Sequence, residues 1–186
     1  MPDPAGALVL GHGAGGGVKS PDLTAAARVA RSAGFSVVLV EQPYRVAGRR
    51  SPAPASQLDA AWLTVIASLR ERALRDVPLV VGGRSLGARV ACRTAAGAVA
   101  VAVLCLAFPL HPPGKADDPS KSRLAELDAV RLPVLVVQGE KDPFGMPPPG
   151  ANRSVVTVPG NHSLRSTAAI EAAVAEWLRT VIAGRS

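Results

Sequence analysis

The stretch LVVGGRSLG, from Leu79 to Gly87, joins an apolar run to a serine flanked by glycines. Leu79–Val81 has the composition of a buried strand, and a helix is expected from about Ser85 to Gly97. A serine on such a tight strand-to-helix turn leaves no room for side chains two positions to either side. Its hydroxyl would lie at the positive end of the helix, where developing negative charge is stabilised. The segment therefore predicts a nucleophile, although alone it equally fits a glycine turn with an N-capping serine.

Apolar, mostly β-branched runs alternate with helical patterns along the rest of the chain. Further strands are expected at residues 7–10, 35–40, 99–106, 134–137 and 154–158. Helices are expected between residues 20 and 34, from residue 56, at 122–129 and over the final segment, with proline-rich loops at 42–55 and 142–150. This repetition predicts one doubly wound α/β domain over residues 1–186, with a mostly parallel sheet of about six strands. In such sheets ligands bind beyond the carboxyl ends of the strands, so the residues that directly follow strands are the candidates for a site.

The ends of the first helix carry their own signals. Ser20 offers a capping hydroxyl, Pro21 occupies the first helical position, and Asp22 places an acid near the positive end of the helix. Gly34 is expected to end the helix before the second strand.

The composition is that of a globular protein. Of 186 residues, 48% are hydrophobic and 19% charged, which argues against disorder. The net charge of +7 would suit an anionic partner, but arginines cluster only at Arg45, Arg49 and Arg50, and aromatic residues make up 3% of the chain. With no nucleic-acid motif and few aromatic rings to stack on bases, we expect a solvated basic surface and no nucleic-acid partner.

The sequence predicts a cytoplasmic protein without a membrane partner. Residues 1–4 lack the basic and apolar regions of a signal peptide. The longest uncharged run, residues 94–110, contains Gly97 and Pro109 and divides into a helix end and a strand. Cys92 and Cys105 lie in apolar stretches without metal-binding spacing, so we expect buried free thiols, no disulfide and no metal or other cofactor.

A base and an acid for the serine follow the last two strands. Of the three histidines, His162 lies directly after the last strand, in PGNHS. Asp142 follows the preceding strand, and Glu140 in the same loop is a less favoured acid. Ser85, Asp142 and His162 come in the chain order expected for a hydrolytic triad on a sheet of this kind, at strand ends that converge.

The glycine-rich loop GHGAGGG, residues 11–17, follows the first strand. A tetrahedral intermediate needs backbone N–H donors, and we expect one from Ala14 and one from Leu86. The same glycines also match a dinucleotide fingerprint, with Glu41 at the end of the next strand as the acid for a ribose. That alternative is less favoured because residues 18–20 separate the glycines from the helix that should bind the pyrophosphate.

Several neighbouring residues are candidates for contact with a substrate. His12 and Gly13 lie in the glycine loop, and His111 follows the fourth strand. Arg84 could bind an anionic substrate group or pair with a nearby carboxylate, and these two interpretations stay open. Tyr44 and Phe144 are candidate walls of the pocket.

The chain resembles α/β-hydrolases, in particular a compact branch akin to dienelactone hydrolases. The resemblance rests on GHGAGG (11–16), EQPYR (41–45), GGRSLGARVA (82–91), FPLHPPGK (108–115), QGEKDPFG (138–145) and PGNHSL (159–164), and it covers nearly the whole chain. The same branch resembles the hydrolase-like domain of a subunit of the animal non-specific-lethal chromatin complex. The resemblance implies that Ser85 is the nucleophile, His162 the base and Asp142 its orienting acid.

Departures from the family pattern limit what the resemblance implies. Dienelactone hydrolases have cysteine where this chain has Ser85, so their substrate is not carried over. The chain begins at the third strand of the full fold, and the segment between its fourth and fifth strands is too short for the usual lid domain. We therefore expect a lidless serine hydrolase that acts on esters or thioesters of small acyl groups. The high content of Ala, Arg, Gly and Pro resembles that of proteins from GC-rich bacterial genomes, so we expect a bacterial source. The alternative from another class is a non-catalytic interaction module on the same fold.

Overall fold

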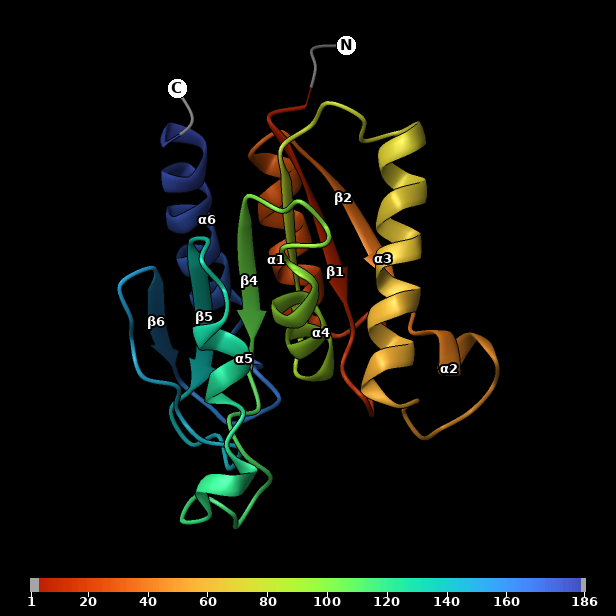
Figure 1. Cartoon of the computed structure of the whole chain (residues 1–186). Coiled ribbons are helices and arrows are strands. Elements are labelled where there is room, and N and C mark those ends of the chain that lie inside the picture. The colour runs from red at the N-terminus through yellow and green to blue at the C-terminus, as the bar shows by residue number, and fades with distance from the viewer. Residues whose placement is uncertain (1–3, 185–186) are drawn as a thin grey trace.

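Six parallel strands form one sheet in the computed structural model, which describes residues 4–184 (Figure 1). In sheet order these are β2 (Phe35–Val40), β1 (Gly6–Gly11), β3 (Leu79–Arg84), β4 (Ala102–Leu106), β5 (Val134–Gly139) and β6 (Arg153–Val158). Every pair of neighbouring strands is parallel. The predicted sheet of about six strands is thereby confirmed. Residues 1–3, on which the prediction about a signal peptide partly rests, lie outside the described residues.

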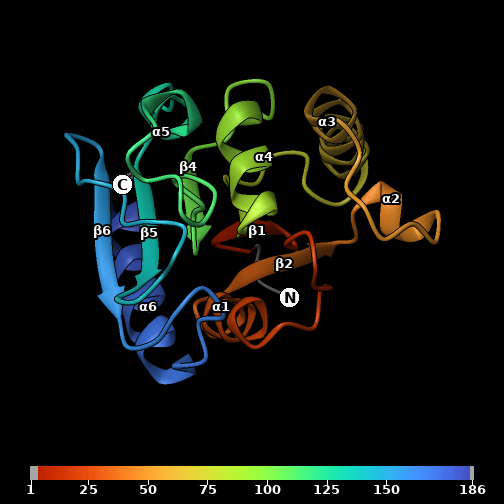
Figure 2. The same ribbon diagram turned by 90° about the horizontal axis from the view of Figure 1, so that it is seen from below.

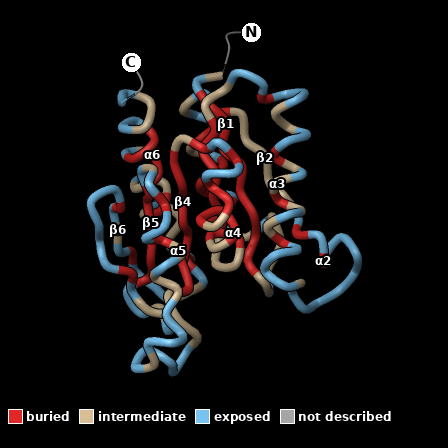
Figure 3. Tube along the Cα trace, in the orientation of Figure 1, coloured by how far each residue is buried: buried red, intermediate tan, exposed pale blue. Residues whose placement is uncertain are grey.

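Helices cover both faces of the sheet, as predicted for a doubly wound fold (Figure 2). On one face lie α1 (Pro21–Ser32) and α6 (Thr167–Ala183), which contact each other. On the other lie α3 (Ala55–Arg72), α4 (Leu86–Thr94) and α5 (Leu124–Asp128). The core therefore has two apolar layers separated by the sheet. In Figure 3 the central strands are buried over nearly their whole length, as expected when helices cover both faces of a parallel sheet.

Local structure departs from the predictions at three places. The loop expected at 42–55 contains the short helix α2 (Pro43–Val46). The strand expected from residue 99 begins at Ala102, because Val99 lies in a turn with a φ of 49° and is 74% exposed. Ser20 is the N-cap of α1, but its hydroxyl makes no capping bond, so that prediction is wrong. Gly34, with a φ of 81°, follows α1 as predicted.

The two cysteines are free and buried, as predicted. Their Sγ atoms lie 3.5 Å apart, between α4 and β4. The hydrogen bond shared with Cys92, together with burial, raises the pKa of the Cys105 thiol well above its usual range. Within residues 4–184, no helix has the length and hydropathy needed to cross a bilayer.

Candidate active site

Ser85 stands on the sharp turn between β3 and α4. Its backbone is in the left-handed region, with a φ of 52° and a ψ of −110°, a conformation that costs a non-glycine residue about 1–3 kcal/mol. A Cβ on Gly83 would lie 2.7 Å from the carbonyl carbon of Gly87, and one on Gly87 would lie 2.5 Å from the carbonyl carbon of Gly11. The glycines therefore flank the serine because backbone occupies the space that a side chain would need.

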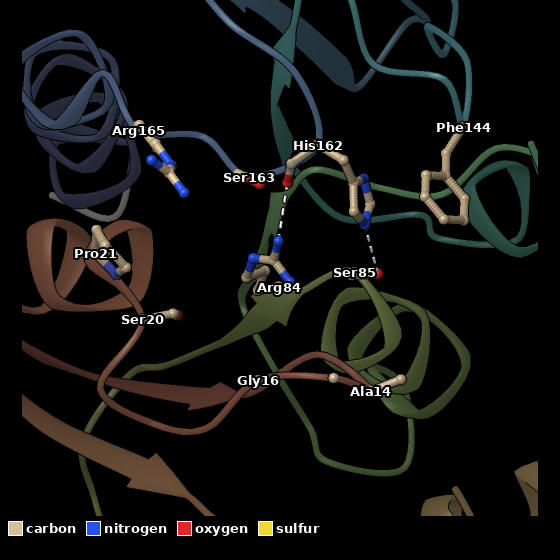
Figure 4. A pocket seen from close by; sticks show the side chains of 11 residues that line it. Ala14, Gly16, Ser20, Pro21, Arg84, Ser85, Phe144, His162, Ser163 and Arg165 are labelled. Atoms are coloured by element: carbon tan, nitrogen blue, oxygen red, sulfur yellow. Dashed lines mark hydrogen bonds between the residues drawn. The ribbon is translucent and has the colours of Figure 1, made fainter. Parts of the chain in front are cut away.

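Ser85, His162 and Asp142 form a continuous hydrogen-bonded chain, of which Figure 4 shows the bond between Ser85 and His162. The Oγ of Ser85 lies 3.0 Å from Nε2 of His162, and Nδ1 of His162 lies 2.9 Å from Oδ2 of Asp142. The Asp142 side chain is 1% exposed and that of His162 is 18% exposed, so the carboxylate is shielded while the imidazole reaches the surface of a cleft. The three residues follow β3, β6 and β5, whose carboxyl ends meet at one edge of the sheet.

Gln138, which the sequence analysis did not single out, holds the carboxylate of Asp142. Its Nε2 donates to Oδ2 of Asp142 at 2.8 Å and also lies within hydrogen-bond distance of the carbonyl oxygens of Phe108 and Gly145. The backbone N–H of Phe144 donates to Oδ1 of Asp142 at 2.9 Å. A polar residue inside the otherwise apolar run of β5 is the signal that could have identified Gln138. Glu140 is exposed and lies 3.9 Å from Lys141.

Two backbone amides next to the serine turn are free, one in the glycine loop after β1 and one at the first residue of α4. Within residues 4–184, neither the N–H of Ala14 nor that of Leu86 is donated to a backbone or side-chain acceptor. The Tyr44 hydroxyl donates to the carbonyl oxygen of Ala14 at 3.1 Å, and burial raises the pKa of Tyr44 despite the opposing charge of Arg45. Ala14 is thus held by its carbonyl while its N–H stays available.

His12 supports this loop from behind. It is fully buried, its Nδ1–H donates to the carbonyl oxygen of Gly13 at 2.7 Å, and its Nε2 accepts the backbone N–H of Gln42 at 2.9 Å. Both ring nitrogens are therefore occupied. The helix α1 begins only at Pro21, so the glycines of the rival dinucleotide motif do not open a helix directly, and Glu41 is exposed.

An open cleft of about 720 Å³ lies over the serine. It is lined by Ala14, Gly15, Gly16, Ser20, Pro21, Arg84, Ser85, Phe144, His162, Ser163 and Arg165. The Phe144 ring packs against the imidazole of His162 with a centroid distance of 4.1 Å. Ser20, Ser163 and Arg165 were not predicted, and a position next to the histidine or the glycine loop is the only signal that the sequence carries for them.

Four predicted contact residues do not line the cleft. His12 and Gly13 are buried residues of the glycine loop, and Tyr44 is buried against it. His111 donates from Nδ1 to the carbonyl oxygen of Pro112, and its ring packs against Gly145, where it supports the Phe144 turn. Substrate contact by these four residues stays a prediction: the side chains of His12, Tyr44 and His111 hydrogen-bond to loop carbonyl groups, and Gly13 is itself a buried residue of the glycine loop.

Arg84 does line the cleft, but its guanidinium is occupied. Its Nε lies 2.8 Å from Oδ2 of Asp22, and its Nη2–H donates to the carbonyl oxygen of His162 at 2.9 Å. Of the two interpretations of Arg84 left open by the sequence, pairing with a carboxylate is the one observed. Among the described residues, no cluster of three or more His, Cys, Asp or Glu side chains could hold a metal ion.

Comparison with solved structures supports the same architecture. A serine hydrolase without lid from Xanthomonas campestris superimposes with a TM-score of 0.70 at 21% identity, over 95% of this chain and 85% of that chain. Est1E from Butyrivibrio proteoclasticus gives a TM-score of 0.74 at 17% identity, over 98% of this chain and 90% of that chain. A second Xanthomonas campestris protein, described as a hydrolase of the alpha/beta superfamily, gives 0.69 at 21% identity, over 94% and 99%.

At the level of sequence, no curated protein matches the chain. A family model described as an alpha/beta hydrolase domain matches residues 4–184, nearly the full length. The lidless α/β architecture and the serine turn after β3 agree with that match. The chain therefore belongs to the alpha/beta hydrolase family.

Proposed function

We propose that the chain is a serine hydrolase that cleaves esters or thioesters of small acyl groups through a covalent acyl-enzyme on Ser85. The observation that carries the proposal is the unbroken hydrogen-bonded chain from Ser85 through His162 to the shielded carboxylate of Asp142, at the surface of an open cleft. A nucleophile bonded to a base, with the base oriented by a third group, is the arrangement that activates a serine.

In the first step, Nε2 of His162 takes the proton of the Ser85 hydroxyl as Oγ attacks the carbonyl carbon of the substrate. The Asp142 carboxylate accepts the Nδ1–H bond, keeps the imidazole in the tautomer with a free Nε2 and stabilises the imidazolium that forms. The imidazolium then gives its proton to the departing alcohol or thiol. In the second step, His162 removes a proton from water as the water oxygen attacks the acyl carbon. The bond between the acyl carbon and Oγ then breaks, the imidazolium returns its proton to Oγ, and the acid is released.

The oxyanion formed in each step needs donors that are fixed before the reaction. The free N–H groups of Ala14 and Leu86 are our candidates: one lies on the glycine loop and the other at the first residue of α4. The positive end of α4 adds a favourable field at the same place. Removal of one such donor from a hydrolase costs about 100- to 1,000-fold in kcat.

The cleft favours small or flexible acyl groups. Its volume of about 720 Å³ lies within the usual range of small-molecule sites, and the Phe144 ring supplies an apolar wall beside His162. Est1E, which shares the fold, has been crystallised with ferulic acid, an acid of moderate size. That precedent supports testing small aromatic as well as aliphatic esters.

Fluorophosphonate labelling tests the proposal, because the probe reacts with activated serines. We expect labelling of the wild type and none of Ser85→Ala or His162→Ala, while Ser68→Ala, an exposed serine of α3, should label normally. A series of p-nitrophenyl esters and one acetyl thioester would then define acyl length and leaving group. A well-folded wild type that neither labels nor cleaves any ester would contradict the proposal and favour a non-catalytic interaction module.

A further inference from the structure

One guanidinium contacts three segments around the cleft. Arg84 is the last residue of β3 and directly precedes the nucleophile. Its Nε lies 2.8 Å from Oδ2 of Asp22 in the first turn of α1, and its Nη2–H donates to the carbonyl oxygen of His162 at 2.9 Å. A Cβ on Gly13 would lie 2.8 Å from Nη1, so the guanidinium also packs on the backbone of the glycine loop.

Asp22 fixes the guanidinium in this position. Its side chain is fully buried, and a buried carboxylate without a partner is strongly destabilising. Within residues 4–184, Arg84 is the one cationic side chain that forms an ion pair with it. The pairing also neutralises Arg84, which is 16% exposed. An arginine whose charge is matched by a buried carboxylate and whose Nη2–H is donated to a protein carbonyl is poorly placed to bind a substrate anion.

The hydrogen bond from Arg84 to the carbonyl oxygen of His162 is one of two bonds that join the loop containing His162 to the turn containing Ser85. Among the described residues, the loop over residues 159–166 makes two hydrogen bonds to Arg84 and Ser85: the Nη2–carbonyl bond and the Nε2–Oγ bond itself. Its remaining hydrogen bonds stay within the loop, reach Lys141 and Asp142 in the loop after β5, or join the start of α6. Without Arg84, the 3.0 Å contact between Ser85 and His162 would be the one hydrogen bond left, among the described residues, between this loop and the turn that carries Ser85.

We propose that Arg84, held by Asp22, is a positioning residue for the hydrolysis: it sets the distance between His162, Ser85 and the glycine loop and does not bind the substrate. This inference rests on the proposed function. A displacement of about 1 Å in a catalytic group can cost about 100-fold in rate. We therefore expect Arg84→Gln and Asp22→Asn to lower kcat by about 10- to 100-fold and to change KM by less than about twofold.

Arg84→Lys separates geometry from charge. A lysine can reach one of the two acceptors but cannot direct two N–H bonds at fixed angles as a guanidinium does. The lysine variant should recover part of the kcat lost in Arg84→Gln. Arg153→Lys is the matched control, because Arg153, at the start of β6, is another buried arginine in an ion pair, at 2.9 Å from the exposed carboxylate of Asp128. It should leave kcat unchanged.

The kinetic test uses two esters with the same leaving group, p-nitrophenyl acetate and p-nitrophenyl hemisuccinate, which differ by a carboxylate. A positioning role predicts the same loss of kcat for both esters in Arg84→Gln and Asp22→Asn. An increase in KM confined to the hemisuccinate would assign Arg84 to substrate binding and overturn the inference. An unchanged kcat in an Arg84→Gln protein with wild-type circular dichroism would also overturn it.

A second readout does not depend on turnover. The proton on Nδ1 of His162, bonded to Asp142, should give a downfield proton NMR signal that is absent from His162→Gln. We expect Arg84→Gln and Asp22→Asn to broaden or shift this signal, and Arg153→Lys to preserve it. An unchanged signal in both variants would overturn the inference. If the wild type cleaves no ester, the proposed function fails, and the NMR comparison still decides whether Arg84 positions His162. If Arg84→Gln does not fold, Arg84→Lys and Asp22→Asn give both readouts.

Discussion

Gly87→Ala is the substitution whose effect the structure defines most sharply. Glycine-to-alanine changes within helices usually stabilise a protein by up to about 1 kcal/mol. At Gly87, in the first turn of α4, the added Cβ would lie 2.5 Å from the carbonyl carbon of Gly11 and 3.0 Å from the carbonyl oxygen of His12. Atoms in ordinary contact lie about 3.5–4.0 Å apart, so α4 and the end of β1 would have to separate by about 1 Å.

The size of the effect follows from the nature of the atoms in contact. Overpacking costs about 1–3 kcal/mol, and the upper end applies here because backbone on both sides cannot rotate away. After subtraction of the gain in helix propensity, we expect a loss of about 2 kcal/mol, which for a domain of this size lowers Tm by about 4–8 °C. The same displacement moves the glycine loop away from Ser85, so fluorophosphonate labelling should slow by about 100-fold.

Thermal denaturation and labelling rates of Gly87→Ala, measured beside Gly97→Ala, test this reasoning. The Cβ added at Gly97 would lie 3.2 Å from Cδ2 of Leu63, the end of a flexible side chain that can move. That variant should keep the wild-type labelling rate and change Tm by less than about 2 °C. If Gly87→Ala melts and labels like the wild type, backbone crowding is not the reason for glycine at this position.

Three further outcomes are expected from buried polar groups. Tyr44 is the only tyrosine, and burial raises its pKa, so absorbance at 295 nm should titrate with a midpoint above pH 10. The contribution of the Tyr44 hydroxyl to stability should therefore be complete below about pH 10 and lost as pH rises through the pKa of Tyr44 in the folded state, and Tyr44→Phe should reduce that alkaline loss. Gln138→Leu should lower the labelling rate and reduce stability by about 2 kcal/mol or more, since a hydrogen bond to a charged group contributes about 1.5–3 kcal/mol, whereas equal labelling would show that Asp142 needs no such support. Native protein should react with a thiol reagent at neither Cys92 nor Cys105 near pH 8 and at both in guanidinium chloride, and rapid native reaction would contradict the burial and raised pKa of this pair.

Much of the fold could be predicted because its strands are covered on both faces. A parallel strand between two helical layers is apolar at nearly every position, and residues 134–137 show this without any structural information. The start of β4 could not be predicted in the same way. Val99 is apolar and β-branched like its neighbours, yet it lies in an exposed turn that follows α4. Its sequence context does not distinguish it from a strand residue.

In the candidate site, too, some residues could be predicted from the sequence and others could not. Ser85, Asp142 and His162 could be proposed together because each directly follows a strand, and strand ends converge wherever the intervening helices lie. The contacts that orient them could not, because they depend on side chains brought together only by folding. Asp22 and Arg84 belong to different α/β units, and Gln138 was hidden among apolar neighbours. His12 and Tyr44 were candidates for substrate contact, yet both are fully buried and hydrogen-bond to the glycine loop, and loop sequence does not indicate which side chains turn inward.

The missing cover over the cleft has a consequence for how the proposed reaction ends. Residues 107–133, between β4 and β5, carry only α5 and the 3-10 helix Pro119–Lys121, and none of them lines the cleft. An acyl group on Ser85 would therefore be open to any small nucleophile in the medium as well as to water. Methanol should compete as an acceptor and divert part of the acyl groups into methyl esters, in proportion to its concentration. In such an enzyme the protein selects the acyl donor, and the surrounding solution determines the product.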